Sequence, residues 1–136
     1  MNKSELDKLG NKILRLGLGF LFVWGGIEKL VVEYFGGVGL EKMANSLQRI
    51  GFGFLGESGT YALAIWLAVS ELIAGLLILL NFKTFYASLY AAFILIVALF
   101  TVYITRGDWM QSMIHIALIS AYIALGLQSY NFIKNK

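Results

Sequence analysis

The sequence contains no cysteine, no proline and only one histidine, His115. Without cysteine the chain cannot form disulfides, carry out dithiol chemistry or hold a cluster through thiolate ligands. A haem held between two histidines of one chain is excluded as well, because there is no second histidine. Charged residues make up 14% of the chain, whereas about 25% is usual in soluble domains. This shortage of charge argues against an ordinary soluble domain.

The sequence is instead rich in long runs of apolar residues. Apolar residues make up 59% of the chain and concentrate at residues 13–32, 61–80, 84–104 and 113–133. Each run has about twenty residues, the length at which a helix crosses about 30 Å of hydrocarbon. We therefore expect an all-α fold, an integral membrane four-helix bundle that forms a single transmembrane domain over residues 1–136.

The first run also resembles the start of a secretory signal, because a basic segment precedes it. It is longer than the apolar core of a typical signal, however, and it leaves through GGIEKLVVE without an A-x-A-like cleavage site. We expect it to be retained as the first membrane helix.

The distribution of basic residues predicts how the bundle is oriented. Four spans place both termini and the turn at residues 81–83 on one side, which then carries seven lysines and arginines. The other side carries four: Lys29, Lys42, Arg49 and Arg106. Because cytoplasmic loops are enriched in lysine and arginine, we expect both termini in the cytoplasm. The net charge of +3 then reflects topology, and no nucleic-acid partner is predicted.

Residues 33–60 form the one long connection, on the expected outer side. Within it, apolar residues recur at helical spacing over residues 40–50, and charged or amide side chains take the other face. This pattern predicts an amphipathic helix between the first and second membrane helices, lying in the membrane interface or capping the bundle. A helix that docks a partner protein would show the same pattern.

Glu71 stands near the middle of the second apolar run. It shares a helix face with Ala64, Ala68 and Gly75, at successive spacings of four, three and four residues. Small residues let helix backbones approach closely within lipid, so this face is expected to meet another helix. Glu71 should therefore face protein and not lipid.

Other polar side chains are expected in the outer half of the bundle. Glu28 and Lys29 lie near the outer end of the first run, Arg106 lies in the turn before the fourth, and His115 lies about one turn into the fourth. Aromatic residues share faces with two of them. The predicted ligand-binding set is Trp24, Glu28, Lys29, Glu71, Arg106, His115 and Tyr122.

Two explanations of this cluster stay open. An ionisable group inside a membrane often serves function, so Glu71 could exchange protons with His115 as its partner. With neighbouring aromatic rings, such a pair would suit a quinone, whose carbonyls accept hydrogen bonds and are protonated on reduction. Alternatively, Glu71 is protonated or paired with a cation such as Lys29 or Arg106, and simply joins two helices.

No metal site is predicted. Glu28, Glu71 and His115 are suitable ligand types, but no ligand-spacing motif connects them. The H-E-x-x-H and G-x-S-x-G motifs and a phosphate-binding loop are absent from the sequence as well.

Several segments form a recognisable series: RLGLGFLFVWGGIEKL at 15–30, FGGVG at 35–39, ANSLQRIGF at 44–52 and SELIAGLLILL at 70–80. Taken in this order, they resemble the DoxX family of small four-helix bacterial membrane proteins. The resemblance covers about residues 13–130. The chain departs from the family at 81–84, where NFKT replaces the usual Thr-Arg, and at 128–131, where QSYN lacks the serine–aspartate pattern.

The resemblance implies a redox setting. Some family members are subunits of thiosulfate:quinone oxidoreductase and related respiratory assemblies, and others are linked to oxidative stress. It also implies that Glu28, Lys29 and Glu71 occupy recurrent polar positions of the family.

We expect a redox-associated protein of the bacterial cytoplasmic (inner) membrane that binds quinone or a similar amphipathic molecule. Glu71 and His115 are the candidates for proton exchange. Electrons would need a partner protein or a bound cofactor, and the sequence leaves open whether the chain is itself an enzyme. The alternatives are a non-catalytic anchor or assembly subunit of a larger complex, and a small proton or solute carrier that acts as a homo-oligomer.

Overall fold

The computed structural model describes residues 2–31 and 39–134, with side chains as far as residue 130. Every secondary-structure element in this part of the chain is a helix, which confirms the predicted all-α class. The elements in chain order are α1 (Lys3–Leu30), α2 (Gly39–Leu47), the π-helical segment η1 (Gln48–Phe52), the 3-10 helix η2 (Gly53–Leu55), α3 (Gly56–Leu79), α4 (Thr84–Ala98), the π-helical segment η3 (Leu99–Tyr103) and α5 (Trp109–Lys134).

Three helical stretches are long and apolar enough to cross a membrane: Gly39–Leu79, Thr84–Tyr103 and Trp109–Tyr130. They contain or overlap the predicted runs at 61–80, 84–104 and 113–133, so the membrane character of the protein is confirmed.

The described part of α1 is not one of these three stretches. Its apolar stretch is bounded by Arg15 on one side and by Glu28 and Lys29 on the other. The predicted first run extends to residue 32, which lies outside the described residues. A fourth crossing therefore stays a prediction.

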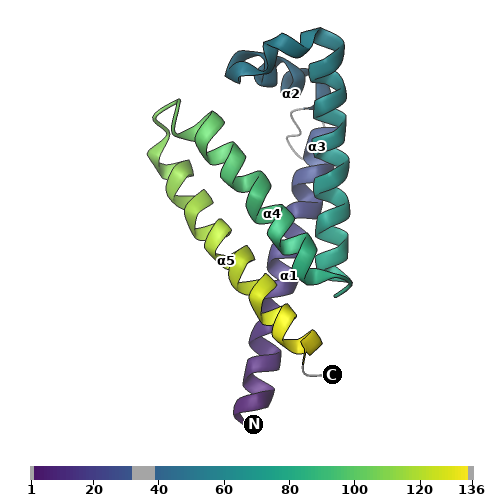
Figure 1. Ribbon diagram of the computed structural model, residues 1–136, viewed down its shortest axis with the longest axis vertical. Coiled ribbons are helices and arrows are strands. Elements are labelled where there is room, and N and C mark those ends of the chain that lie inside the picture. Colours follow the sequence, from purple (N-terminus) through teal and green to yellow (C-terminus); the bar gives the residue numbers. More distant parts are fainter. Residues whose placement is uncertain (1, 32–38, 135–136) are drawn as a thin grey trace.

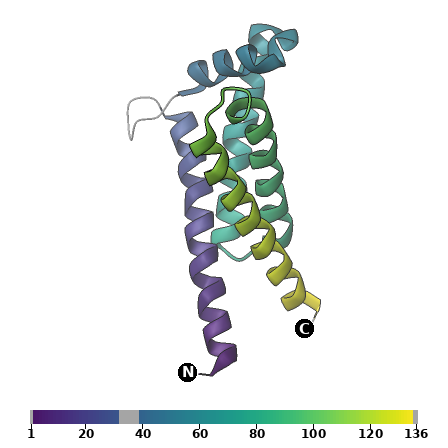
Figure 2. The ribbon, with the colours of Figure 1, turned by 90° about the vertical axis from the view of Figure 1, so that its left-hand side faces the viewer.

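The long helices form two antiparallel pairs, α1 with α3 and α4 with α5 (Figure 1). The α4–α5 hairpin is inclined to the α1–α3 pair, so the two pairs diverge toward the end at which α2 lies. Figure 2 shows α2 lying across this end, and we call it the α2 end. The start of α1 and the end of α5 both lie at the opposite end.

Glycines bring the backbones of α1 and α3 together. A Cβ atom at Gly26 of α1 would lie 2.8 Å from the carbonyl oxygen of Ala68, and one at Gly75 of α3 would lie 2.5 Å from the amide nitrogen of Val23. Either distance is too short for a real side chain. On α3, Ala64, Ala68, Glu71 and Gly75 are all buried, so the stripe predicted to face protein does so.

The α4–α5 pair meets the α1–α3 pair through aromatic residues. Tyr122 of α5 is fully buried, and its hydroxyl donates a hydrogen bond of 2.7 Å to the carbonyl oxygen of Leu18 on α1. The Tyr122 ring packs edge-on against Phe22, with 5.0 Å between the ring centroids. Ile78 of α3 and Leu125 of α5 complete this buried centre.

The predicted amphipathic helix at 40–50 is present as α2 and the beginning of η1. Its apolar residues Ala44 and Leu47 are buried against Ala64 of α3. The amide of Gln48 donates a hydrogen bond of 3.1 Å to the hydroxyl of Thr60, which is fully buried. The apolar face of α2 therefore covers the upper part of α3, while its placement in a membrane interface stays a prediction.

Candidate functional site

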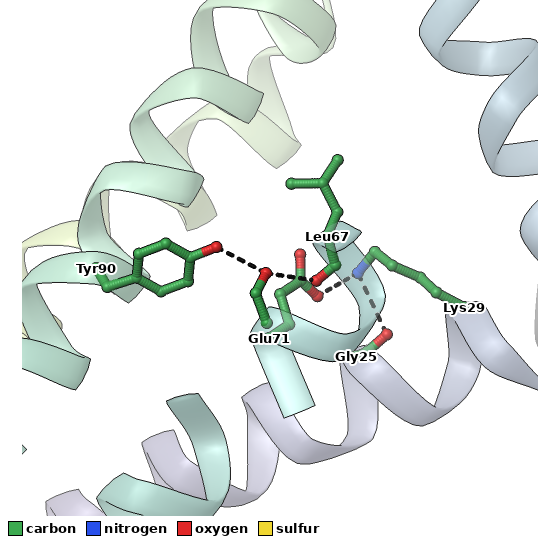
Figure 3. Close-up of polar contacts among 6 residues, drawn as sticks. Gly25, Lys29, Leu67, Glu71 and Tyr90 are labelled. Atoms are coloured by element: carbon green, nitrogen blue, oxygen red, sulfur yellow. Dashed lines mark hydrogen bonds and ion pairs between the residues drawn. The ribbon is translucent and has the colours of Figure 1, made fainter. Parts of the chain in front are cut away.

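An ion pair between Lys29 and Glu71 joins α1 to α3 (Figure 3). The Nζ atom of Lys29 lies 2.5 Å from Oε2 of Glu71 and donates a second hydrogen bond of 3.2 Å to the carbonyl oxygen of Gly25. The two side chains are only 22% and 11% exposed. Glu71 is thus paired with Lys29, one of the two cations that the sequence offered.

Local structure places both partners. Lys29 lies in the last turn of α1, where the helix dipole favours a positive charge. Glu71 lies on the buried stripe of small residues on α3. A Cβ atom at Gly25 would stand 3.3 Å from Oε2 of Glu71, so the glycine leaves room for the carboxylate. The close approach of α1 and α3 therefore fixes the register at which the charges meet.

A second polar link joins α4 to α3 beside this pair. The Tyr90 hydroxyl donates a hydrogen bond of 2.6 Å to the Ser70 hydroxyl, which donates one of 3.0 Å to the carbonyl oxygen of Leu67 (Figure 3). The Tyr90 ring also packs edge-on against Trp66, with 6.2 Å between centroids. Ser70 directly precedes Glu71 in the sequence. Adjacent residues of α3 therefore bind Tyr90 of α4 and Lys29 of α1.

Tyr103 and His115 form a ring pair between η3 and α5. Their ring centroids are 4.2 Å apart, and both side chains are half-buried. Nδ1 of His115 lies 2.9 Å from the carbonyl oxygen of Gln111. Because a carbonyl oxygen can only accept, Nδ1 carries a proton, and in the neutral ring Nε2 is left as an acceptor.

Charged groups also affect Tyr103. The larger electrostatic effects come from Arg106 and Asp108 in the turn before α5, and weaker ones come from Glu71 and Glu28 of the other helix pair. We use the name polar cluster for the Lys29–Glu71 ion pair, Glu28, the Tyr103–His115 ring pair and Arg106, of which Arg106 is exposed.

The family model of DoxX matches residues 10–104. The chain belongs to the DoxX family. No curated protein and no solved structure matches it. The matched range contains Lys29, Glu71, Tyr90 and Tyr103 but ends before Arg106 and His115. The DoxX assignment therefore covers the ion pair and the tyrosine link, and does not reach α5.

Of the seven predicted site residues, the structure of this DoxX protein brings Lys29 and Glu71 into direct contact. His115 packs against Tyr103, while Glu28, Glu71 and Arg106 affect Tyr103 only through longer-range electrostatics. Whether these residues bind a ligand stays a prediction.

The other two predicted residues lie elsewhere in the DoxX fold. Trp24 lies at the surface of α1 with its ring 5.9 Å from that of Phe20. Tyr122 lies in the core, and its hydroxyl hydrogen is used in the bond to Leu18. Among the described residues, no group of three or more histidine, aspartate or glutamate side chains could hold a metal ion.

Sequence reasoning missed Ser70, Tyr90 and the central position of Tyr103. A signal was available for Tyr90, because it places a hydroxyl inside an otherwise apolar run, and such a group needs a partner in lipid. Tyr103 lies at the end of the predicted run 84–104, where an aromatic ring is usual and gives no signal of a site. The position of the Tyr103 side chain depends on the inclination of α4 to α3, and this angle cannot be inferred from the spacing of apolar residues in the sequence.

Proposed function

We propose that this DoxX protein is a redox-associated subunit of a bacterial cytoplasmic membrane. It binds quinone, or an amphipathic molecule with similar carbonyl groups, between the α1–α3 and α4–α5 pairs. The observation that carries the proposal is the Lys29–Glu71 ion pair, whose side chains are only 22% and 11% exposed among apolar helices. Ionisable side chains are costly to place among apolar membrane helices, so where they occur they usually mark a functional site.

The proposed chemistry assigns a role to each group. A quinone accepts two electrons and two protons when it becomes a quinol, so its carbonyl oxygens need hydrogen-bond donors and a source of protons. Lys29 can donate a hydrogen bond, and Glu71 can exchange a proton when Lys29 turns from it to a ligand. His115 can pass a proton through Nε2. The electrons come from a partner protein, because none of these side chains carries them.

The proposal includes the membrane topology. The start of α1 and the end of α5 lie at one end of the molecule, which supports an even number of crossings, with α1 as the fourth span. Both termini then lie in the cytoplasm, on the side richer in lysine and arginine. The α2 end lies at the outer face, with α2 in the membrane interface.

One observation favours a second candidate function, a non-catalytic anchor or assembly subunit. The Glu71 carboxylate is already satisfied by Lys29, and this bond joins two helices of the same chain. A polar pair of this kind can serve helix association alone. In that case the removal of Glu71 would weaken the fold and leave no ligand-binding defect of its own.

The two candidates are separated by the small molecules that co-purify with the protein. Wild type, Glu71→Gln and Glu57→Gln are purified in a mild detergent, and extracted quinone is quantified by mass spectrometry. Glu57 is a matched control, because it is an exposed carboxylate on the same helix. The redox proposal predicts quinone in wild type and in Glu57→Gln and a loss of at least about tenfold in Glu71→Gln, as expected when a charge-assisted contact is removed. Equal quinone content in all three proteins would contradict it.

A further inference from the structure

A cavity of about 860 Å³ lies at the α2 end, outside the contact of Lys29 with Glu71. It is formed where η1 meets η3 and the turn that follows η3. Ligand-binding clefts have volumes of about 300 to 1,000 Å³, so this one is large enough for a headgroup. Its lining residues are Ser46, Arg49, Ile50, Gly51, Thr101, Thr105 and Arg106.

The charge of the lining is entirely positive. Arg49 and Arg106 come from opposite walls, and no carboxylate lines the cavity. Neither guanidinium forms an ion pair or a hydrogen bond with another residue of the described chain, although Arg106 also contributes to the field at Tyr103. Both arginines are exposed, and two arginines lining one cavity without a carboxylate are suited to an anion, because each planar guanidinium can donate to two oxygens of a phosphate.

The hydroxyl groups that line the cavity differ in whether their hydrogens are already used in hydrogen bonds. The Thr101 hydroxyl donates to the carbonyl oxygen of Val97, and the Thr105 hydroxyl donates to that of Thr101, so both hydrogens are used within their own helix. The Ser46 hydroxyl forms no hydrogen bond with another described residue and lies exposed. The free donors of the cavity are therefore Ser46 and the two arginines.

Irregular backbone forms both walls. Gly51 of η1 has φ 116°, a conformation that favours glycine, and it turns the chain directly beside Arg49. On the opposite wall, the π-helical segment η3 contributes Thr101. Single π-helical turns inside helical stretches occur often at functional sites. The kink at Gly51 and the π-helical segment η3 meet at this cavity, and this observation is independent of its charge.

Exposed aromatic rings follow both arginines closely in the sequence. Phe54, which follows η1, is 80% exposed, and Trp109, which follows Arg106, is 69% exposed. In a membrane protein such rings at the ends of spans lie at the level of the lipid headgroups. This position favours a lipid over a solute as the source of the anion.

We propose that this cavity binds the phosphate group of an anionic phospholipid through Arg49, Arg106 and the Ser46 hydroxyl. The inference rests on the proposed topology, which places the α2 end at the membrane interface, but not on quinone binding, because Arg49 and Ser46 lie outside the polar cluster. The bound lipid also joins η1 to the turn before α5 at the end where the two helix pairs diverge.

The test measures lipid binding to the purified full-length protein in detergent by native mass spectrometry. The probes are dioleoyl phosphatidylglycerol and dioleoyl phosphatidylcholine, titrated against wild type, Arg49→Gln and Arg49→Lys. Lys42→Gln is the matched control, because Lys42 is an exposed cation of the neighbouring α2 and does not line the cavity. Circular dichroism confirms that each variant is folded.

Wild type and Lys42→Gln are expected to bind phosphatidylglycerol more tightly than phosphatidylcholine. Arg49→Gln should bind phosphatidylglycerol about tenfold more weakly, and Arg49→Lys should fall between the two, because lysine keeps the charge but loses the two-pronged contact. An added arm with inorganic phosphate identifies the source. Competition with phosphatidylglycerol shows that free phosphate also enters the site, and no competition shows that the lipid is required. Unchanged binding of phosphatidylglycerol by folded Arg49→Gln would overturn the proposal.

Discussion

The two main helix contacts of this DoxX protein are held together in different ways. Between α1 and α3, glycines bring the backbones close, and a single ion pair, Lys29–Glu71, crosses the interface. Between the two helix pairs, long aromatic side chains reach across, with Tyr90 on Ser70 and Tyr122 on the Leu18 carbonyl. The first contact has no room for a side chain at Gly26 or Gly75, whereas the second is joined by hydrogen bonds from the Tyr90 and Tyr122 hydroxyls. The polar cluster lies where these two kinds of contact meet.

The largest effect should come from filling the α1–α3 contact. Gly75→Leu would force its side chain into the backbone of α1 at Val23, so the helices must separate. We expect a loss of at least about 3 kcal/mol in the free energy of unfolding. Gly17→Leu is the control, because a Cβ atom at Gly17 meets nothing within 4 Å. Unfolding measured in detergent by circular dichroism checks both, and equal stability of the two variants would refute the close approach.

Breaking the ion pair should have the next largest effect. Lys29→Met leaves the Glu71 carboxylate among apolar residues without its partner. Removal of one partner of a fully buried pair costs about 3–5 kcal/mol, and we expect about 2 kcal/mol here because Lys29 is 22% exposed. Lys42→Met, a change of an exposed lysine, should leave the unfolding curve unchanged. A Lys29→Met protein as stable as wild type would show that the pair does not hold α1 to α3.

A smaller effect is expected between the helix pairs. Tyr90→Phe removes the hydroxyl that bonds to Ser70 and keeps the ring against Trp66. One hydrogen bond contributes about 1 kcal/mol, so the variant should unfold at slightly lower denaturant concentration. Tyr86→Phe on the same helix is the control, since that ring is exposed. If both variants behave alike, the Tyr90 link contributes nothing.

The smallest effect, and one of opposite sign, is expected inside the α4–α5 pair. The Ser88 hydroxyl is fully buried and has no hydrogen-bond partner among the described residues. Ser88→Ala should therefore be neutral or stabilising by up to about 1 kcal/mol. Ser112, whose buried hydroxyl donates to the Asp108 carbonyl, provides the contrast, because Ser112→Ala should destabilise. A destabilised Ser88→Ala protein would reveal a partner for that hydroxyl.

Much of this arrangement was predictable, for identifiable reasons. Apolar runs of membrane length give the helices, and the small-residue spacing around Glu71 gives its buried face. The partner was not predictable, since Lys29 and Arg106 were both available. The choice depends on the register of α1 against α3, which is fixed by the close backbone contacts at Gly26 and Gly75. The place of Tyr103 was not predictable either, because the ring that it packs against, His115, comes from another helix.

The measurement that tests the central claim most directly is the quinone content of the charge-swapped double variant Lys29→Glu/Glu71→Lys. This variant keeps an ion pair between α1 and α3, so its stability should recover relative to Lys29→Met. If the polar cluster binds quinone, the swapped protein should fold and still lose the quinone that wild type retains, because the acid and the cation have exchanged places. A stable swapped protein that carries quinone at the wild-type level would contradict the account and leave Lys29–Glu71 as a link between helices.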